Sequence, residues 1–127
     1  MSKEIINTSN APAPIGPYNQ SVKANGFLFV SGQIAIIPET NELEMRGVKE
    51  ETRQVMENIK AILTEAGLGF EHVVKCSIFL NDMGLFTYVN EVYGSYFTEG
   101  GAPARETVAV QTLPKNVNVE ISVIAAY

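Results

Sequence analysis

Apolar residues recur at helical spacing in two segments of the chain. The first runs from Val48 to Ala66, where apolar side chains repeat every three or four residues, and Gly67 follows as a natural helix stop. The charged residues on its other face are Glu50, Glu51, Glu57 and Lys60. The second follows Asp82, a favourable N-cap, and its apolar face holds Phe86, Val89, Val92, Tyr93, Tyr96 and Phe97. We predict an amphipathic helix over each segment.

Other segments have the alternation or the β-branched content of strands: residues 4–7, 21–24, 27–34, 73–80, 105–111 and 117–127. Asn25-Gly26 is a strong hairpin signal, so the second and third of these strands should pair antiparallel. Gly32 lies inside the third, where glycine marks a bulge or a close backbone approach. Residues 8–19 contain three prolines and form a long loop of the kind that is often functional.

This order of elements predicts an α+β fold. Two helices should cover one face of a mostly antiparallel sheet, and the opposite face must then meet water or another subunit. At 127 residues, with no repeat and no shift in composition, the chain is expected to form one domain over residues 1–127.

Composition excludes several kinds of partner. The net charge of -5, with no cluster of Lys or Arg, argues against nucleic acid. A single cysteine, Cys76, rules out an internal disulfide framework and fits a reducing compartment. The first residues lack the apolar stretch of a signal peptide, and no apolar run approaches the length of a membrane span. We therefore expect a cytoplasmic protein that binds neither membrane nor nucleic acid.

Two charged residues stand out in the last strands. Alternation with Val108 and Val110 should turn Arg105 away from the helices, and Glu120 should share that helix-free face. A short hairpin at residues 113–116 would make their strands neighbours. From spacing alone, an exposed cross-strand ion pair worth about 0–1 kcal/mol is the simpler interpretation. The alternative is a ligand site, because the planar guanidinium of Arg105 suits a small carboxylate and Glu120 can hold a water.

The remaining reactive side chains have plainer interpretations. Cys76 lies among apolar residues, which favours a packed thiol over a nucleophile. His72 has no second His or paired Cys at ligand spacing, which favours a surface residue over a metal ligand or base. No sequence motif for nucleotide, metal or serine-hydrolase chemistry is present, so we expect neither a metal nor a cofactor.

Several blocks, in order and over nearly the whole chain, resemble those of the RidA (YjgF-like) imine deaminases. They are Ala11-Pro12 with Ile15-Gly16-Pro17-Tyr18, Ser31-Gly32-Gln33-Ile34, Asn58-Ile59-Lys60-Ala61-Ile62-Leu63, Pro103-Ala104-Arg105, and Leu113-Pro114-Lys115 through Val119-Glu120-Ile121. The resemblance implies a chorismate-mutase-like α+β fold assembled as a homotrimer, with active sites at the subunit interfaces. It also implies the reaction, which is the cofactor-independent hydrolysis of 2-iminopropanoate and 2-iminobutanoate to 2-keto acids and ammonia.

The resemblance further assigns roles to individual residues. Arg105 would clamp the substrate carboxylate, and Glu120 would position the attacking water and manage its proton. Tyr18 would complete the catalytic set, lining the cleft with Ser31 by hydroxyls near the imine nitrogen. The remaining substrate-binding positions are main-chain groups at Gly32 and Thr107 and the side chain of Asn90.

The chain departs from the family pattern directly after Arg105. Many members have Ser-Cys there, whereas this chain has Glu106-Thr107. Thr107 serves equally if only the backbone amide is used, and alternation should point Glu106 to the face opposite Arg105. Two other functions stay open: a non-catalytic trimer that binds a small carboxylate metabolite and regulates a partner protein, and a ribonuclease, against which the acidic charge argues.

Overall fold

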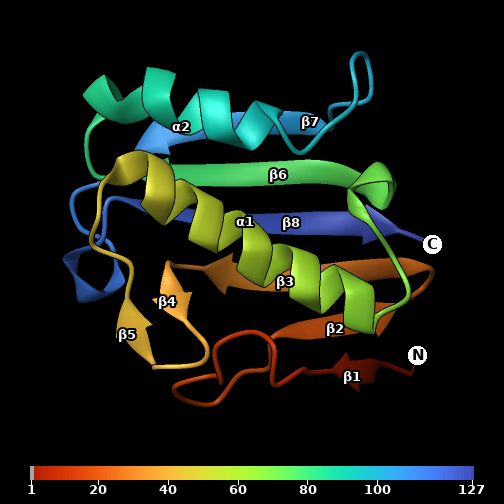
Figure 1. Ribbon diagram of the computed structural model, residues 1–127. Helices are drawn as coiled ribbons and strands as arrows, with labels where there is room; N and C mark the ends of the chain where they lie inside the picture. The colour runs from red at the N-terminus through yellow and green to blue at the C-terminus, as the bar shows by residue number, and fades with distance from the viewer. Residues whose placement is uncertain (1) are drawn as a thin grey trace.

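The computed structural model describes residues 2–127, and Met1 lies outside the described part of the predicted domain. It has one sheet of six strands in the order β1-β2-β3-β8-β6-β7, with helices α1 and α2 lying together over one face (Figure 1). The strands are β1 Glu4–Ile6, β2 Ser21–Ala24, β3 Phe27–Gln33, β6 Val73–Leu80, β7 Ala104–Ala109 and β8 Val119–Ala126. The helices are α1 Val48–Glu65 and α2 Phe86–Gly94. The α+β prediction is confirmed.

Local signals place most of these elements where the sequence predicts them. Asn25 and Gly26 both have positive φ, 52° and 81°, as a tight hairpin turn requires, and β2 pairs with β3 antiparallel across it. Gly67, with φ 79°, follows α1, and the amide of Leu68 donates to the carbonyl of Leu63 at 2.8 Å. The carboxylate of Asp82 accepts from the amide of Gly84 at 2.8 Å and caps the turn that leads into α2.

Apart from the turn at residues 113–116, the smaller elements were not predicted from the sequence. A two-stranded hairpin joins β4 Ile36–Ile37 to β5 Glu42–Leu43, and short 3-10 turns occupy η1 Phe70–His72, η2 Met83–Leu85 and η3 Pro114–Asn116. Within residues 2–127 neither helix has the length and apolar character that crossing a membrane would require.

The order of the last strands differs from the prediction. β6 pairs with β8 antiparallel and with β7 parallel, so β6 separates the two strands that we expected to form a hairpin. Segment 110–118 instead passes the end of β6, where the amide of Val110 donates to Leu80 and the amide of Asn81 to Asn118. The physical reason is burial. β8 carries the more apolar face and takes the central position, whereas β7 is left at the edge.

The core fills the space between the helices and the sheet. Val55, Met56, Ile59, Ile62 and Leu63 of α1 are fully buried against the inward side chains of β3, β6 and β8. Burying one such side chain stabilises the fold by about 1.5–3 kcal/mol.

The opposite face of the sheet is not covered by the helices, and it carries exposed apolar side chains beside polar ones. Phe27 and Phe29 are 42% and 46% exposed, and Val108 on the far edge strand is 43% exposed. Register aligns Phe29 with Ile124 of β8, whereas Ile124 pairs on its other side with Lys75 of β6, so the apolar patch on this face ends at β8. An uncovered sheet face with exposed apolar side chains is typical of a surface that another subunit covers.

Candidate active site

An irregularity in β3 marks the start of the candidate site. Val30 pairs with Val123 and Gln33 with Ile121, so β3 has one more residue than β8 between these pairs. This β-bulge holds Ser31 and Gly32, and it bends the strand at the point where they face β8. The sequence interpretation of Gly32 as a bulge or a close approach is confirmed.

Gly32 is also the point over which the carboxylate of Glu120 lies. A Cβ atom at position 32 would come within 2.9 Å of Cδ of Glu120, closer than real Cβ contacts allow, and within 3.2 Å of Cγ, which is tighter than most. The absence of a side chain at Gly32 therefore leaves the space that the Glu120 carboxylate occupies. Burial raises the pKa of the Glu120 carboxyl above its ordinary value, because desolvation disfavours the charged form.

Gln20 shapes the long loop of residues 8–19, a role that sequence analysis missed. Its side chain is buried, and its Oε1 accepts from the amide of Thr8 at 2.7 Å. Its Nε2 donates to the carbonyls of Thr8, Ala11 and Pro12 at 3.0, 3.3 and 2.8 Å. One amide side chain thus pairs with four main-chain groups of the loop. Because proline has no amide proton, a loop with several prolines has more carbonyl acceptors than amide donors, and Gln20 supplies a donor.

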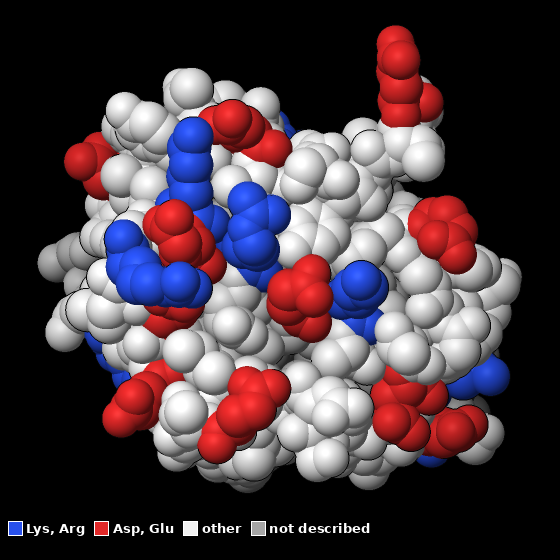
Figure 2. Space-filling view, viewed as in Figure 1, with Lys and Arg blue, Asp and Glu red and all other residues white. Residues whose placement is uncertain are grey.

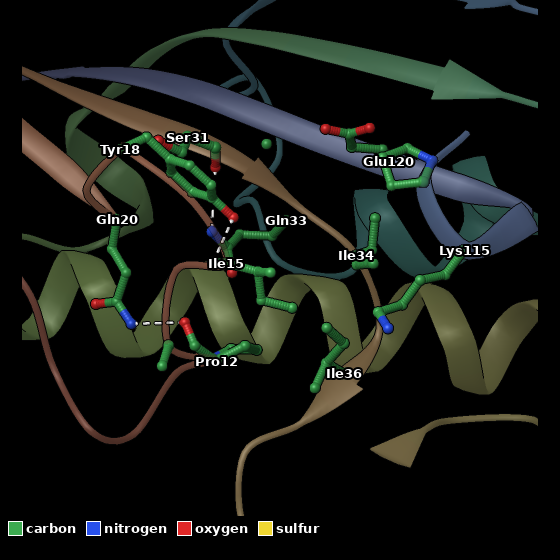
Figure 3. Close-up of a pocket in the computed structure, with 13 residues that line it drawn as sticks. Pro12, Ile15, Tyr18, Gln20, Ser31, Gln33, Ile34, Ile36, Lys115 and Glu120 are labelled. Atoms are coloured by element: carbon green, nitrogen blue, oxygen red, sulfur yellow. Dashed lines mark hydrogen bonds between the residues drawn. The ribbon is translucent and has the colours of Figure 1, made fainter. Parts of the chain in front are cut away.

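The two hydroxyls of the predicted site lie where this loop meets the bulge. Ser31 Oγ donates to the carbonyl of Asn19 at 2.6 Å, which leaves its oxygen free to accept. Tyr18 Oη accepts from the amide of Ile15 at 3.3 Å, so its own proton remains for donation. Tyr18 is half exposed, and it lines the same pocket as Ser31 (Figure 3).

A cavity of about 510 Å³ opens in front of these groups. Its wall includes Tyr18, Ser31, Gly32 and Glu120, and Figure 3 shows the Glu120 carboxylate on β8 across from the loop. Most of the remaining wall is apolar, and Lys115 is its second charged residue. Lys115 has φ 55°, a left-handed backbone that is uncommon outside glycine and asparagine. The cavity thus combines an acid, two hydroxyls and an ammonium group.

Glu51 holds the start of the strand that carries Glu120. Its carboxylate accepts from the amides of Asn118 and Val119 at 2.8 and 3.1 Å and from Asn118 Nδ2 at 2.8 Å. Glu51 is only 5% exposed, so its predicted place on the solvent face of the helix is wrong. Its charge made it look like a surface residue, but it lies in the first turn of α1 against unpaired strand amides that attract a carboxylate.

Arg105 lies away from this cavity, under α2. Its Nη1 donates to Oδ1 of Asn90 at 2.6 Å, and its Cζ lies 5.5 Å from the ring centre of Phe86 and 5.0 Å from that of Tyr93. In β7 it pairs with the buried Cys76 of β6, which faces the helices. The prediction that Arg105 occupies the helix-free face is therefore wrong.

Strand alternation fixes the two faces of β7, but it does not say which face the helices cover. We assigned Val108 to the covered face because it is apolar, yet the uncovered face carries apolar side chains too. Glu106 lies there, where Ser77 Oγ and Lys75 hold the pKa of its carboxyl below the ordinary value. The prediction that Glu106 and Arg105 point to opposite faces is confirmed.

Thr107 follows on the same face as Arg105, and its Oγ1 is buried without a partner among residues 2–127. Glu120 pairs with Phe79 of β6, whereas Arg105 pairs with Cys76, three residues earlier. An odd separation along one strand means opposite faces. Within one chain, therefore, Glu120, Tyr18, Ser31 and Gly32 come together, and Arg105, Asn90 and Thr107 form a separate group.

Comparison with known proteins gives the class of this fold and site. A family model described as Endoribonuclease L-PSP matches residues 8–127. A RutC family protein from Synechocystis is 52% identical over 98% of this chain and 97% of its own. The chain therefore belongs to the RidA/YjgF/RutC (L-PSP) family, and its fold is the YjgF/chorismate-mutase-like fold. The resemblance in the sequence is confirmed.

Two further relatives bear on what members of the family do. The protein named Reactive Intermediate Deaminase A from Arabidopsis thaliana is 42% identical over 98% of this chain and 66% of its own. The crystal structure of E. coli TdcF with bound serine is 41% identical, with a TM-score of 0.92 over 98% of each chain. The family thus includes reactive intermediate deaminases.

Among the described residues, neither Cys76 nor His72 lines the cavity, and neither is placed to act as a nucleophile there. Cys76 is fully buried, and burial raises the pKa of its thiol, so the thiolate that would act as a nucleophile is disfavoured. His72 Nδ1 accepts from the amide of Gly69 at 3.1 Å, a local turn contact. Within residues 2–127, no group of three or more His, Cys, Asp and Glu is placed to hold a metal ion.

Proposed function

We propose that this chain hydrolyses small 2-imino acids, such as 2-iminopropanoate and 2-iminobutanoate, to 2-keto acids and ammonia. The observation that carries the proposal is the Glu120 carboxylate, held over the glycine of a β-bulge beside the hydroxyls of Tyr18 and Ser31. Membership of a family that includes reactive intermediate deaminases supports it.

The proposed reaction needs one water and one proton carrier. The water oxygen forms a bond to the imine carbon while Glu120 accepts a water proton, and the same carboxyl then protonates the nitrogen. This first transfer gives a carbinolamine; the carboxylate then takes the proton of its hydroxyl and passes it to the amino group as the carbon–nitrogen bond breaks, so ammonia leaves and the oxygen becomes that of the keto acid. No electrons are gained or lost, so the proposed reaction needs no redox cofactor, and we propose that it uses no cofactor of another kind. Tyr18 donates to and Ser31 accepts from the nitrogen centre, in keeping with their hydrogen bonds.

Arg105 is proposed to bind the substrate carboxylate, with Asn90 and the main chain at Thr107 and Gly32 completing the site. Because Arg105 and Glu120 lie on opposite faces of the sheet, one substrate bridges them only if a second copy contributes one of the two. We therefore propose a homotrimer with its active sites between subunits. The uncovered face with Phe27, Phe29 and Val108 supplies an apolar surface for such an assembly.

A coupled assay tests the proposed reaction. Serine dehydratase generates 2-aminoacrylate in place, and the release of pyruvate is followed with wild-type protein, with Glu120→Gln, and without added protein. The expected result is faster release with wild type and the uncatalysed rate with Glu120→Gln, because the amide cannot accept the water proton. Equal rates in all three arms, repeated with threonine as the source, would reject the proposal.

A second candidate function is the binding of a small amino or keto acid without turnover. The relative with bound serine favours it, since serine carries the carboxylate that Arg105 suits. Binding needs Arg105 but not Glu120. Retained serine binding by Glu120→Gln together with lost turnover supports the deaminase, whereas binding by wild type without any turnover supports the second candidate.

RNA cleavage, which the name of the family model suggests, finds little support in the charge of this chain. The net charge is -5, and acidic and basic groups intermix on the face shown in Figure 2. A phosphate backbone requires a continuous basic surface. We accordingly propose a small-molecule substrate and no nucleic-acid partner, and on the strength of the single cysteine we propose that the protein acts in the cytoplasm.

A further inference from the structure

Three residues of α2 form a stripe that faces Arg105. Phe86, Asn90 and Tyr93 lie at spacings of four and three residues, which places them on one side of the helix. All three contact the Arg105 guanidinium, Asn90 through its amide oxygen and the two rings at 5.5 and 5.0 Å from Cζ. An aromatic face attracts a guanidinium at these distances.

Tyr93 is the most firmly held member of the stripe. It is 4% exposed, and its ring packs against that of Phe97 with the centroids 5.0 Å apart. Its hydroxyl is buried and has no hydrogen-bond partner of normal geometry among residues 2–127; only the weakly accepting thiol of Cys76 lies beside it. Tyr93 is therefore held mainly by the packing of its ring, and its hydroxyl contributes little.

Arg105 needs such support because of where it lies. β7 is the edge strand of the sheet, with β6 as its only neighbour in the described part of the chain. An arginine side chain has large rotational freedom, and freedom that is lost on binding weakens the affinity for the ligand. Contacts that order the side chain beforehand remove that cost. Asn90 engages Nη1, so Nε and Nη2 keep an edge of the guanidinium for a ligand.

We propose that Tyr93 is a positioning residue that holds the Arg105 guanidinium under its π face and thereby orders the carboxylate-binding edge before substrate arrives. This inference rests on the proposed function, because it assigns Arg105 to the substrate carboxylate. Tyr93 acts through Arg105 and not on the reacting atoms. It therefore governs KM and leaves kcat nearly unchanged.

Three variants test the inference in the coupled assay. Tyr93→Leu removes the π face, and KM should rise about tenfold with kcat within about twofold of wild type. Tyr93→Phe keeps the ring and removes only the hydroxyl, so it should match wild type. Tyr88→Leu is the matched control, since it is the same change on the same helix at a residue that is 49% exposed, with its ring near Lys49.

A double-mutant cycle separates positioning from direct contact and from loss of fold. In an Arg105→Ala background, Tyr93→Leu should cause no further fall in kcat/KM. A further fall of about tenfold, or an unchanged KM for folded Tyr93→Leu, would overturn the inference. If melting curves show that Tyr93→Leu is unfolded, the same double-mutant cycle is measured with Phe86→Leu, which removes the other ring that contacts Arg105. Wild-type turnover, measured alongside, shows separately whether the proposed function holds.

Discussion

Two regions of this molecule carry site residues, and they are built by different means. The cavity region has Ser31, Gly32 and Glu120 on the central strands β3 and β8, where a bulge and strand pairing place them, and Tyr18 on the loop of residues 8–19 beside them. The arginine region, with Arg105, lies on an edge strand under α2, and side-chain stacking orders it.

This difference separates the parts of the proposed reaction. Positions in the cavity region are set by backbone, which suits groups that must meet a reacting atom within hydrogen-bond reach. In the proposed reaction the arginine region binds the charge of the substrate carboxylate, an interaction that depends less strictly on exact position. Variants of the cavity region should therefore lower kcat, and variants of the arginine region should raise KM.

Arg105→Ala is expected to have the largest effect on substrate binding. Losing a hydrogen bond to a charged group costs about 1.5–3 kcal/mol, which corresponds to a rise in KM of roughly 10- to 150-fold. The measurement is steady-state kinetics in the coupled assay. An unchanged KM would mean that the arginine region is not the carboxylate site.

Gly32→Ala should separate activity from stability. The new Cβ meets the end of the flexible Glu120 side chain, which moves aside at small cost to folding. We expect kcat to fall about tenfold through the loss of positioning, while the melting temperature stays within about 2 °C of wild type. A normal kcat in this variant would show that Glu120 does not need its place over the bulge.

Glu51→Ala should act mainly on stability. It leaves the buried amides of Asn118 and Val119 without their acceptor, at a cost of about 1–3 kcal/mol. We expect the melting temperature to fall by about 5 °C or more. Glu51→Gln keeps an oxygen acceptor and is the matched control, and a fall of the same size in both variants would contradict the assignment.

The smallest effect is a shift in pH dependence. Burial raises the pKa of Glu120, and the base must be ionised, so the acid limb of kcat should lie above the ordinary range of a glutamate. The same pKa shift changes the stability of the fold with pH in the direction opposite to its effect on kcat. Glu120 binds its proton more tightly when folded, and its contribution is present below the unfolded pKa and lost as pH rises through the folded pKa. Melting curves of Glu120→Gln and wild type, compared between the unfolded and the folded pKa of Glu120, check this effect on stability.

Local features of the fold could be predicted from the sequence because they depend on neighbouring residues. Asn25-Gly26 dictates its turn, the apolar periodicity dictates α1, and a glycine within β3 marks the bulge. The order β8-β6-β7 could not be predicted, since it depends on which strand best fills the centre of the sheet.

The sequence could name candidate residues for the site, but it could not give their geometry. Resemblance to a family pointed to Glu120 and Arg105, yet alternation along a strand cannot say which face a helix covers. Gln20 and Glu51 were missed because their roles depend on main-chain groups far along the chain. The only signal for Gln20 in the sequence was its place as a polar residue directly before a predicted strand.

The central claim is that the cavity region of one copy and the arginine region of another form one active site. Mixing Glu120→Gln, which is expected to be inactive, with Arg105→Ala, which is expected to turn over only slowly at substrate concentrations far below its raised KM, tests it after the subunits have been dissociated and reassembled together. Random assembly places an intact Glu120 opposite an intact Arg105 at about one interface in four, so about a quarter of wild-type activity should return. Mixed oligomers that form without any recovered activity would contradict the account.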